Sequence, residues 1–146
     1  MKYKWLYQID MIHEVLENKG FNLVEKTDAD DRVEFEEGHK AVFVNSRCHP
    51  ETRFYTMLHE LGHILVSEDQ QTFSREHPMY VHSEDIPHDG RRERSKAYKV
   101  SLVSEEIEAW KLGRRFAKTL GLYVDDKKYD KHMTENIMSY IEWAAE

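Results

Sequence analysis

The stretch that decides the fold reads Thr56-Met57-Leu58-His59-Glu60-Leu61-Gly62-His63-Ile64-Leu65. Apolar residues recur around it at spacings of three and four, which predicts a helix over about 50–67. On that helix His59 and His63 project from the same face, close enough for both imidazoles to hold one metal ion. Glu60 lies roughly 100° further round the helix, where it can reach a water molecule without being a ligand itself.

Two histidines leave room for a third protein ligand and a water molecule, which is the open arrangement of a catalytic zinc site. A structural zinc site would instead use four protein ligands. Gly62 weakens a helix by up to about 1 kcal/mol relative to alanine, so we expect a packing reason for it. The pattern therefore predicts a catalytic Zn²⁺ site with His59 and His63 as ligands and Glu60 as general base.

Composition restricts the class of protein. The chain has 146 residues, with 21 Lys plus Arg and 28 Asp plus Glu, and its formal net charge is −7. The length predicts one domain over 1–146, and the acidic balance argues against a nucleic-acid partner. No apolar run approaches the roughly 18–20 residues of a membrane span, so no membrane partner is expected. The single cysteine, Cys48, excludes an internal disulfide and favours a cytoplasmic location.

Periodicity and turn residues predict the other elements. They are helices over 5–18, 104–120 and 131–144, and strands over 21–25, 32–36 and 41–45. Gly38 suits a hairpin turn between the last two strands, and the polar region 68–99 is predicted to lack long regular structure. We therefore expect an α+β fold, in which a short antiparallel sheet packs against the histidine helix and a second, ligand-bearing helix. Trp5, Trp110 and Trp143 are interpreted as core residues.

The third ligand has several candidates. Asp69 follows the motif by six residues but lacks the glycine that would turn the chain, and Glu84 has no helix to aim it. Glu105 and Glu106 begin the helix predicted at Ser104. Of these two, Glu106 lies on an inward stripe whose members are three or four residues apart, and Glu105 remains the alternative. The stripe consists of Val103, Glu106, Trp110, Gly113, Ala117 and Leu120.

A second hydrogen-bond donor would stabilise the oxyanion that develops during hydrolysis. His77, Tyr80, His82 and Tyr98 in or near the polar region are candidates, and the sequence does not distinguish them.

Two segments resemble the ImmA/IrrE-like zinc metallopeptidases. They are Val42-Phe43-Val44-Asn45 through the His59–His63 motif, and Glu106-Ile107-Glu108-Ala109-Trp110 with Phe116-Ala117 after it. The resemblance covers about 30–120 and implies a small zincin-like domain whose third ligand is Glu106. The sequence departs from the family at Trp110, where members often carry Asn or Asp. In length and in its Glu-Ala-Trp segment, the chain is most similar to small members from phages and mobile elements.

The resemblance implies a zinc-dependent endopeptidase that cleaves a protein partner, such as a repressor or another regulator. The competing interpretation is a zinc-containing module that binds a regulatory protein without cleaving it. The presence of Glu60 favours the enzyme, because a purely structural site does not need a general base.

Overall fold

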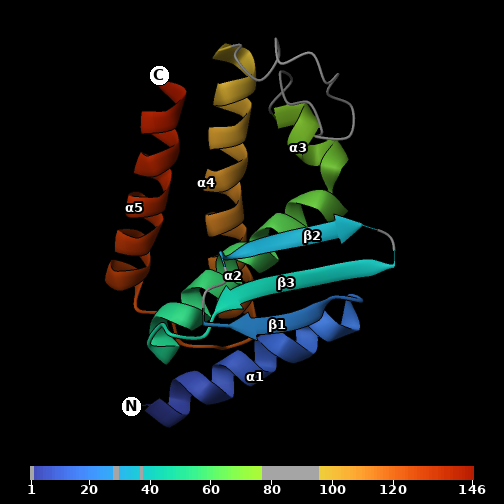
Figure 1. Ribbon diagram of the computed structural model, residues 1–146, viewed down its shortest axis with the longest axis vertical. Helices are drawn as coiled ribbons and strands as arrows, with labels where there is room; N and C mark the ends of the chain where they lie inside the picture. Colours follow the sequence, from blue (N-terminus) through green and yellow to red (C-terminus); the bar gives the residue numbers. More distant parts are fainter. Residues whose placement is uncertain (1, 28–29, 37, 77–95) are drawn as a thin grey trace.

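Five helices and one three-stranded sheet make up the described residues, which are 2–27, 30–36, 38–76 and 96–146 of the computed structural model (Figure 1). In chain order the elements are α1 (Lys2–Asn18), β1 (Asn22–Lys26), β2 (Arg32–Glu36), β3 (His39–Asn45), α2 (Pro50–Glu68), α3 (Gln70–Glu76), α4 (Lys96–Thr119) and α5 (Asp126–Ala144). The predicted α+β class is confirmed. Within the described residues, none of the helices combines the length and apolar character that a bilayer crossing requires.

The sheet has the order β1-β3-β2, with β3 in the middle. β2 and β3 form the predicted antiparallel hairpin, and Gly38 between them has a φ of 82°, which glycine adopts easily. β1 pairs with β3 in parallel, so the sheet is mixed and differs in this respect from the antiparallel one expected. The hairpin pattern specifies how β2 and β3 pair, but no local signal in the sequence specifies the partner of β1 or the direction in which it runs.

α2 is the central element, because it contacts α1, α3, α4, β2 and β3 (Figure 1). The core joins side chains from α1, β3, α2, α4 and α5. Trp5 and Trp110 belong to it, as predicted. Trp143 is only half-buried, with the ammonium group of Lys99 5.4 Å from its ring centre, so its assignment to the core was wrong.

α4 begins eight residues earlier than the sequence predicted. The sequence predicted a start at Ser104, but the helix starts at Lys96 and runs through both Ser101 and Ser104. The hydroxyl of Ser101 donates to the carbonyl of Ala97, so this serine is accommodated inside the helix instead of ending it. Glu106 therefore lies in the middle of α4, and its position is not explained by a favourable charge at a helix N-terminus.

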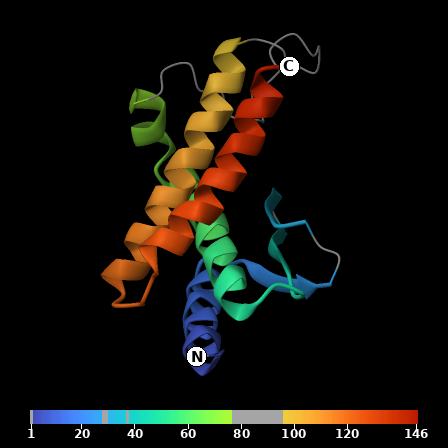
Figure 2. The same cartoon turned by 90° about the vertical axis from the view of Figure 1, so that its left-hand side faces the viewer.

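Two further helices differ from the elements predicted. α3 is a helix of seven residues in the polar region, which was predicted only to lack long regular structure. α5 begins at Asp126 instead of about Lys131, because Asp125 caps it by accepting a hydrogen bond from the amide of Lys128. α4 and α5 lie side by side, as both views show (Figures 1 and 2). Leu120, expected on the inward stripe, follows the end of α4 and is exposed.

Candidate metal centre

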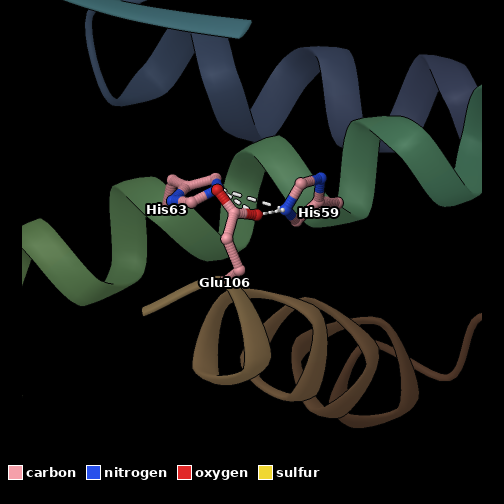
Figure 3. A group of neighbouring side chains, drawn as sticks. All are labelled: His59, His63 and Glu106. Atoms are coloured by element: carbon pink, nitrogen blue, oxygen red, sulfur yellow. Dashed lines mark hydrogen bonds and ion pairs between the residues drawn. The ribbon is translucent and has the colours of Figure 1, made fainter. Parts of the chain in front are cut away.

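α2 presents its two histidines as the sequence predicted. His59 and His63 are one turn apart, and their Nε2 atoms lie 3.1 Å from each other (Figure 3). Only 8% of the His59 side chain and 15% of the His63 side chain are exposed. The two nitrogen atoms thus converge on one shielded point beside the helix.

Glu106 reaches the same point from α4. Its Oε2 atom lies 2.6 Å from Nε2 of His59 and 3.2 Å from Nε2 of His63 (Figure 3). One ligand atom from each of the three residues lies within 4.8 Å of the others. In the described part of the chain, no other group of three or more His, Cys, Asp or Glu side chains has this arrangement.

The close crossing of α2 and α4 depends on two glycines. A Cβ atom on Gly62 would lie 1.8 Å from the carbonyl oxygen of Ala109, and one on Gly113 would lie 2.0 Å from that of Leu58. No side chain fits at either position, which confirms the expectation that Gly62 has a packing reason. The crossing brings Glu106 within reach of both histidines.

The other acidic candidates lie elsewhere. Oε1 of Glu105 is 3.6 Å from Nδ1 of His63, on the side of the ring that faces away from Glu106. Asp69 ends α2 and accepts a hydrogen bond from the amide of Thr72, so it does not point to the histidines. Glu84 lies outside the described residues. Among the three candidate third ligands that the structure describes, Glu106 alone has a carboxylate beside both Nε2 atoms.

Charges in the cluster are strongly coupled. Burial favours the neutral form of Glu106, but hydrogen bonds from both histidines outweigh it and hold the pKa of this carboxyl well below its usual value. Burial lowers the pKa of His59. Burial also opposes charge on His63, yet hydrogen bonds to Glu105 and Glu106 raise its pKa well above the ordinary value. Without a cation, a proton on His63 therefore balances the negative charge of Glu106.

Glu60 is buried beside the cluster and does not join it. Its Oε1 atom lies 3.5 Å from Nδ1 of His59, and only 4% of its side chain is exposed. Burial, partly offset by the positive charge of His63, raises the pKa of Glu60 to about 8, and Glu106 and Asp31 add to the rise. A carboxyl with a raised pKa that faces a cavity is suited to accept and release a proton near neutral pH.

The model of one protein family, described as the IrrE N-terminal-like domain, matches residues 19–107. The chain belongs to this family of ImmA/IrrE-like metallopeptidases. The resemblance stated from the sequence is thereby confirmed. No curated protein and no solved structure matches the chain. The matched residues include the histidine motif and Glu106 but end at Ile107, so the second half of α4 and all of α5 lie beyond them.

The donor set of this ImmA/IrrE-like chain suits zinc. Two neutral imidazole nitrogens and one carboxylate oxygen are the ligand types of His₂Glu catalytic zinc sites. The three side chains are largely buried, and the point on which they converge opens into a cavity of about 650 Å³. Room for a water molecule and a substrate group therefore adjoins the candidate ligands.

One wall of this cavity comes from α5, which sequence reasoning did not connect with the site. The cavity is lined by Asp30, Asp31, Arg32, Val33, Phe35, Thr56, His59, Glu60, His63, Glu106, Trp110, His132, Glu135, Asn136 and Tyr140. The hydroxyl of Tyr140 faces Glu106, and burial together with the charge of Glu106 and a hydrogen bond to it raises the pKa of Tyr140. The sequence did contain a signal for this: Tyr140 follows Ile137 by three residues and Asn136 by four, a spacing that places the three side chains on one face of a helix.

The structure describes one of the four oxyanion donors suggested by the sequence, and that residue is not found in the lining of the cavity. His77, Tyr80 and His82 lie outside the described residues. Tyr98 lies on α4 but is absent from the residues that line the cavity. Tyr140 is therefore a new candidate for this role.

Proposed function

We propose that this chain is a zinc-dependent metalloendopeptidase in which His59, His63 and Glu106 hold the metal and Glu60 acts as general base. The observation that carries the proposal is the position of Glu60. This carboxyl lies beside the three candidate ligands and lines the same cavity, but it is not one of the three converging side chains. A site that only held a metal would not need it.

The proposed division of roles follows from the chemistry of each side chain. A bound zinc ion supplies a Lewis acid for the peptide carbonyl and makes a water molecule far more acidic. Glu60 accepts a proton from the attacking water as the oxygen atom bonds to the carbonyl carbon. The same carboxyl then donates that proton to the amide nitrogen as the C–N bond breaks.

The hydroxyl of Tyr140 is proposed as the donor to the developing oxyanion. It lines the cavity beside Glu106 and is half-buried, which limits the access of bulk water to it. Thr56, the other hydroxyl in the lining, lies on α2 itself, three residues before His59. Tyr140 instead approaches from α5, across the cavity from the histidine helix.

We propose residues 1–146 as one metallopeptidase domain, because side chains from α1, β3, α2, α4 and α5 share a single core. The substrate class follows from the family: a peptidase acts on a protein. We propose a repressor or other regulatory protein as that partner, on the resemblance described above, and the cytoplasm as the compartment, on the single cysteine.

A proteome-derived peptide library tests the proposal, because it presents many peptide sequences at once and requires no chosen substrate. Zinc-loaded wild-type protein, the Glu60→Gln variant and chelated wild-type protein are incubated with the library, and new peptide termini are identified by mass spectrometry. We expect new termini only with the zinc-loaded wild type, while Glu60→Gln retains one zinc per chain by elemental analysis. A zinc-loaded wild-type protein that generates no new termini, but binds a regulatory protein, would support the non-cleaving module instead.

A further inference from the structure

The indole of Trp110 lies flat against the imidazole of His59. The two ring centres are 4.3 Å apart and the ring planes differ by only 8°. Trp110 is 4% exposed and His59 is 7% exposed, so water does not compete for this contact. Stacked aromatic rings at such a separation attract each other, and the contact opposes rotation of the imidazole about its side-chain bond.

The residues that the structure describes do not give Nδ1 of His59 the short hydrogen bond that usually orients a metal-binding histidine. At most metal sites the second ring nitrogen donates to a carboxylate, a carbonyl or a water molecule, which holds the ring in place. Nδ1 of His59 lies 3.5 Å from Oε1 of Glu60, longer than an ordinary N–H···O hydrogen bond. Within the described residues no hydrogen bond to this nitrogen is formed. Nδ1 of His63 lies at a similar distance from a carboxylate, 3.6 Å from Oε1 of Glu105.

Trp110 is itself held in place by α5. Its Nε1–H group donates to Oδ1 of Asn136 at 2.9 Å. The ring of Tyr129 meets the indole edge-on at a centre distance of 5.2 Å, and the Tyr129 hydroxyl donates to the carbonyl of Trp110. The indole is therefore held by contacts with α5 in addition to its contact with His59.

We propose that Trp110 is a positioning residue for the metal centre: anchored by Asn136, it holds the imidazole of His59 in the ligating orientation by stacking. The inference rests on the proposed metal centre. It adds that α5, which lies beyond the residues matched to the family, contributes to metal affinity through the Asn136–Trp110–His59 contacts.

Cobalt titration tests the inference without a substrate, because Co²⁺ replaces Zn²⁺ at such sites and its visible absorption reports ligand geometry. Metal-free wild-type protein is compared with Trp110→Leu, which removes the stacking surface, and Trp110→Phe, which keeps an aromatic ring. Trp143→Phe, at a half-buried tryptophan whose ring faces Lys99, is the matched control. We expect Trp110→Leu to bind cobalt about tenfold more weakly with an altered absorption band, Trp110→Phe to stay within about threefold, and Trp143→Phe to match the wild type.

Asn136→Ala keeps the test decisive if the leucine variant fails to fold, because it removes the anchor without opening the core. We expect a cobalt affinity about threefold below that of the wild type and a broadened absorption band. The inference would be overturned if folded Trp110→Leu bound cobalt with the affinity and spectrum of the wild type. If the leucine variant does not fold, the same result for folded Asn136→Ala would overturn it. Either result would leave the proposed metal centre intact. A wild-type protein that binds no cobalt would overturn both.

Discussion

His63 interacts with two neighbouring glutamates through opposite sides of its ring. Nε2 lies 3.2 Å from Oε2 of Glu106, and Nδ1 lies 3.6 Å from Oε1 of Glu105. A metal ion on the Nε2 side would leave the Nδ1–H group free to interact with the second carboxylate. Consecutive residues of α4 thereby suit two different roles, one as candidate ligand and one as the partner that orients a ligand.

Glutamine substitutions separate these roles. We expect Glu106→Gln to lower zinc affinity by more than about 100-fold, because it removes a ligand charge. Glu105→Gln should lower zinc affinity by about tenfold, since it weakens only the contact that orients His63. Glu108→Gln is the matched control, because Glu108 lines a different pocket beside α3. Competition titration with a zinc indicator measures all three, and equal losses for Glu105→Gln and Glu106→Gln would contradict the assignment.

The helix crossing predicts the effect of one methyl group. We expect Gly62→Ala to lower the free energy of unfolding by about 1–3 kcal/mol or more, because the new Cβ atom overlaps the carbonyl of Ala109. Zinc affinity should fall as well, since α4 must move away from α2 and carry Glu106 with it. Urea denaturation and zinc titration measure the two effects. Lys111→Ala, at an exposed position of α4, should change stability by less than about 0.5 kcal/mol, and a similar value for Gly62→Ala would refute the crossing.

The metal-free protein should lose stability as the pH rises from about 5 to 9. Glu60 has a folded-state pKa of about 8 against an ordinary 4.5, so the folded protein holds a proton that the unfolded chain releases between these values. The difference corresponds to at most about 5 kcal/mol. His63, whose pKa is also raised, stabilises the fold below its ordinary pKa of 6.5, and this contribution is lost as the pH rises through the folded value.

Calorimetry in the presence of a chelator checks this dependence. Glu60→Gln cannot lose a proton, so its melting temperature should fall less steeply with pH than that of the wild type. Glu142→Gln, at an exposed position on α5, controls for the change of net charge. Identical slopes for wild type and Glu60→Gln would show that the raised pKa of Glu60 does not contribute to stability.

Tyr140→Phe tests the proposed oxyanion donor. We expect kcat to fall by about 100-fold with little change in KM, because the hydroxyl acts on charge that develops only in the transition state. The measurement uses a peptide cleaved in the library experiment and zinc-saturated protein. Zinc affinity should change by less than about tenfold. A variant with unchanged kcat but much weaker zinc binding would assign Tyr140 to holding Glu106 alone.

The part of the site that could be predicted depends on local geometry. Spacing of four residues on a helix was enough to place His59 and His63 together. The inward stripe of the second helix selected Glu106, even though that helix begins well before Ser104, because periodicity does not depend on where a helix starts.

The parts of the fold and of the site that the sequence did not predict depend on contacts between distant segments. Tyr140 and Asn136 reach the cavity only because α5 turns back along α4, a packing that local patterns do not encode. Trp110 was correctly interpreted as buried, but burial alone did not reveal that its neighbour in the core is a candidate metal ligand. The parallel pairing of β1 was missed for the same reason.

The wall that α5 contributes to the cavity limits how far this protein can be truncated. A fragment cut at the end of the family match, Ile107, would retain both histidines and Glu106 yet lack the indole, the amide and the phenol that surround them. The smallest working unit we would express therefore extends at least through Tyr140.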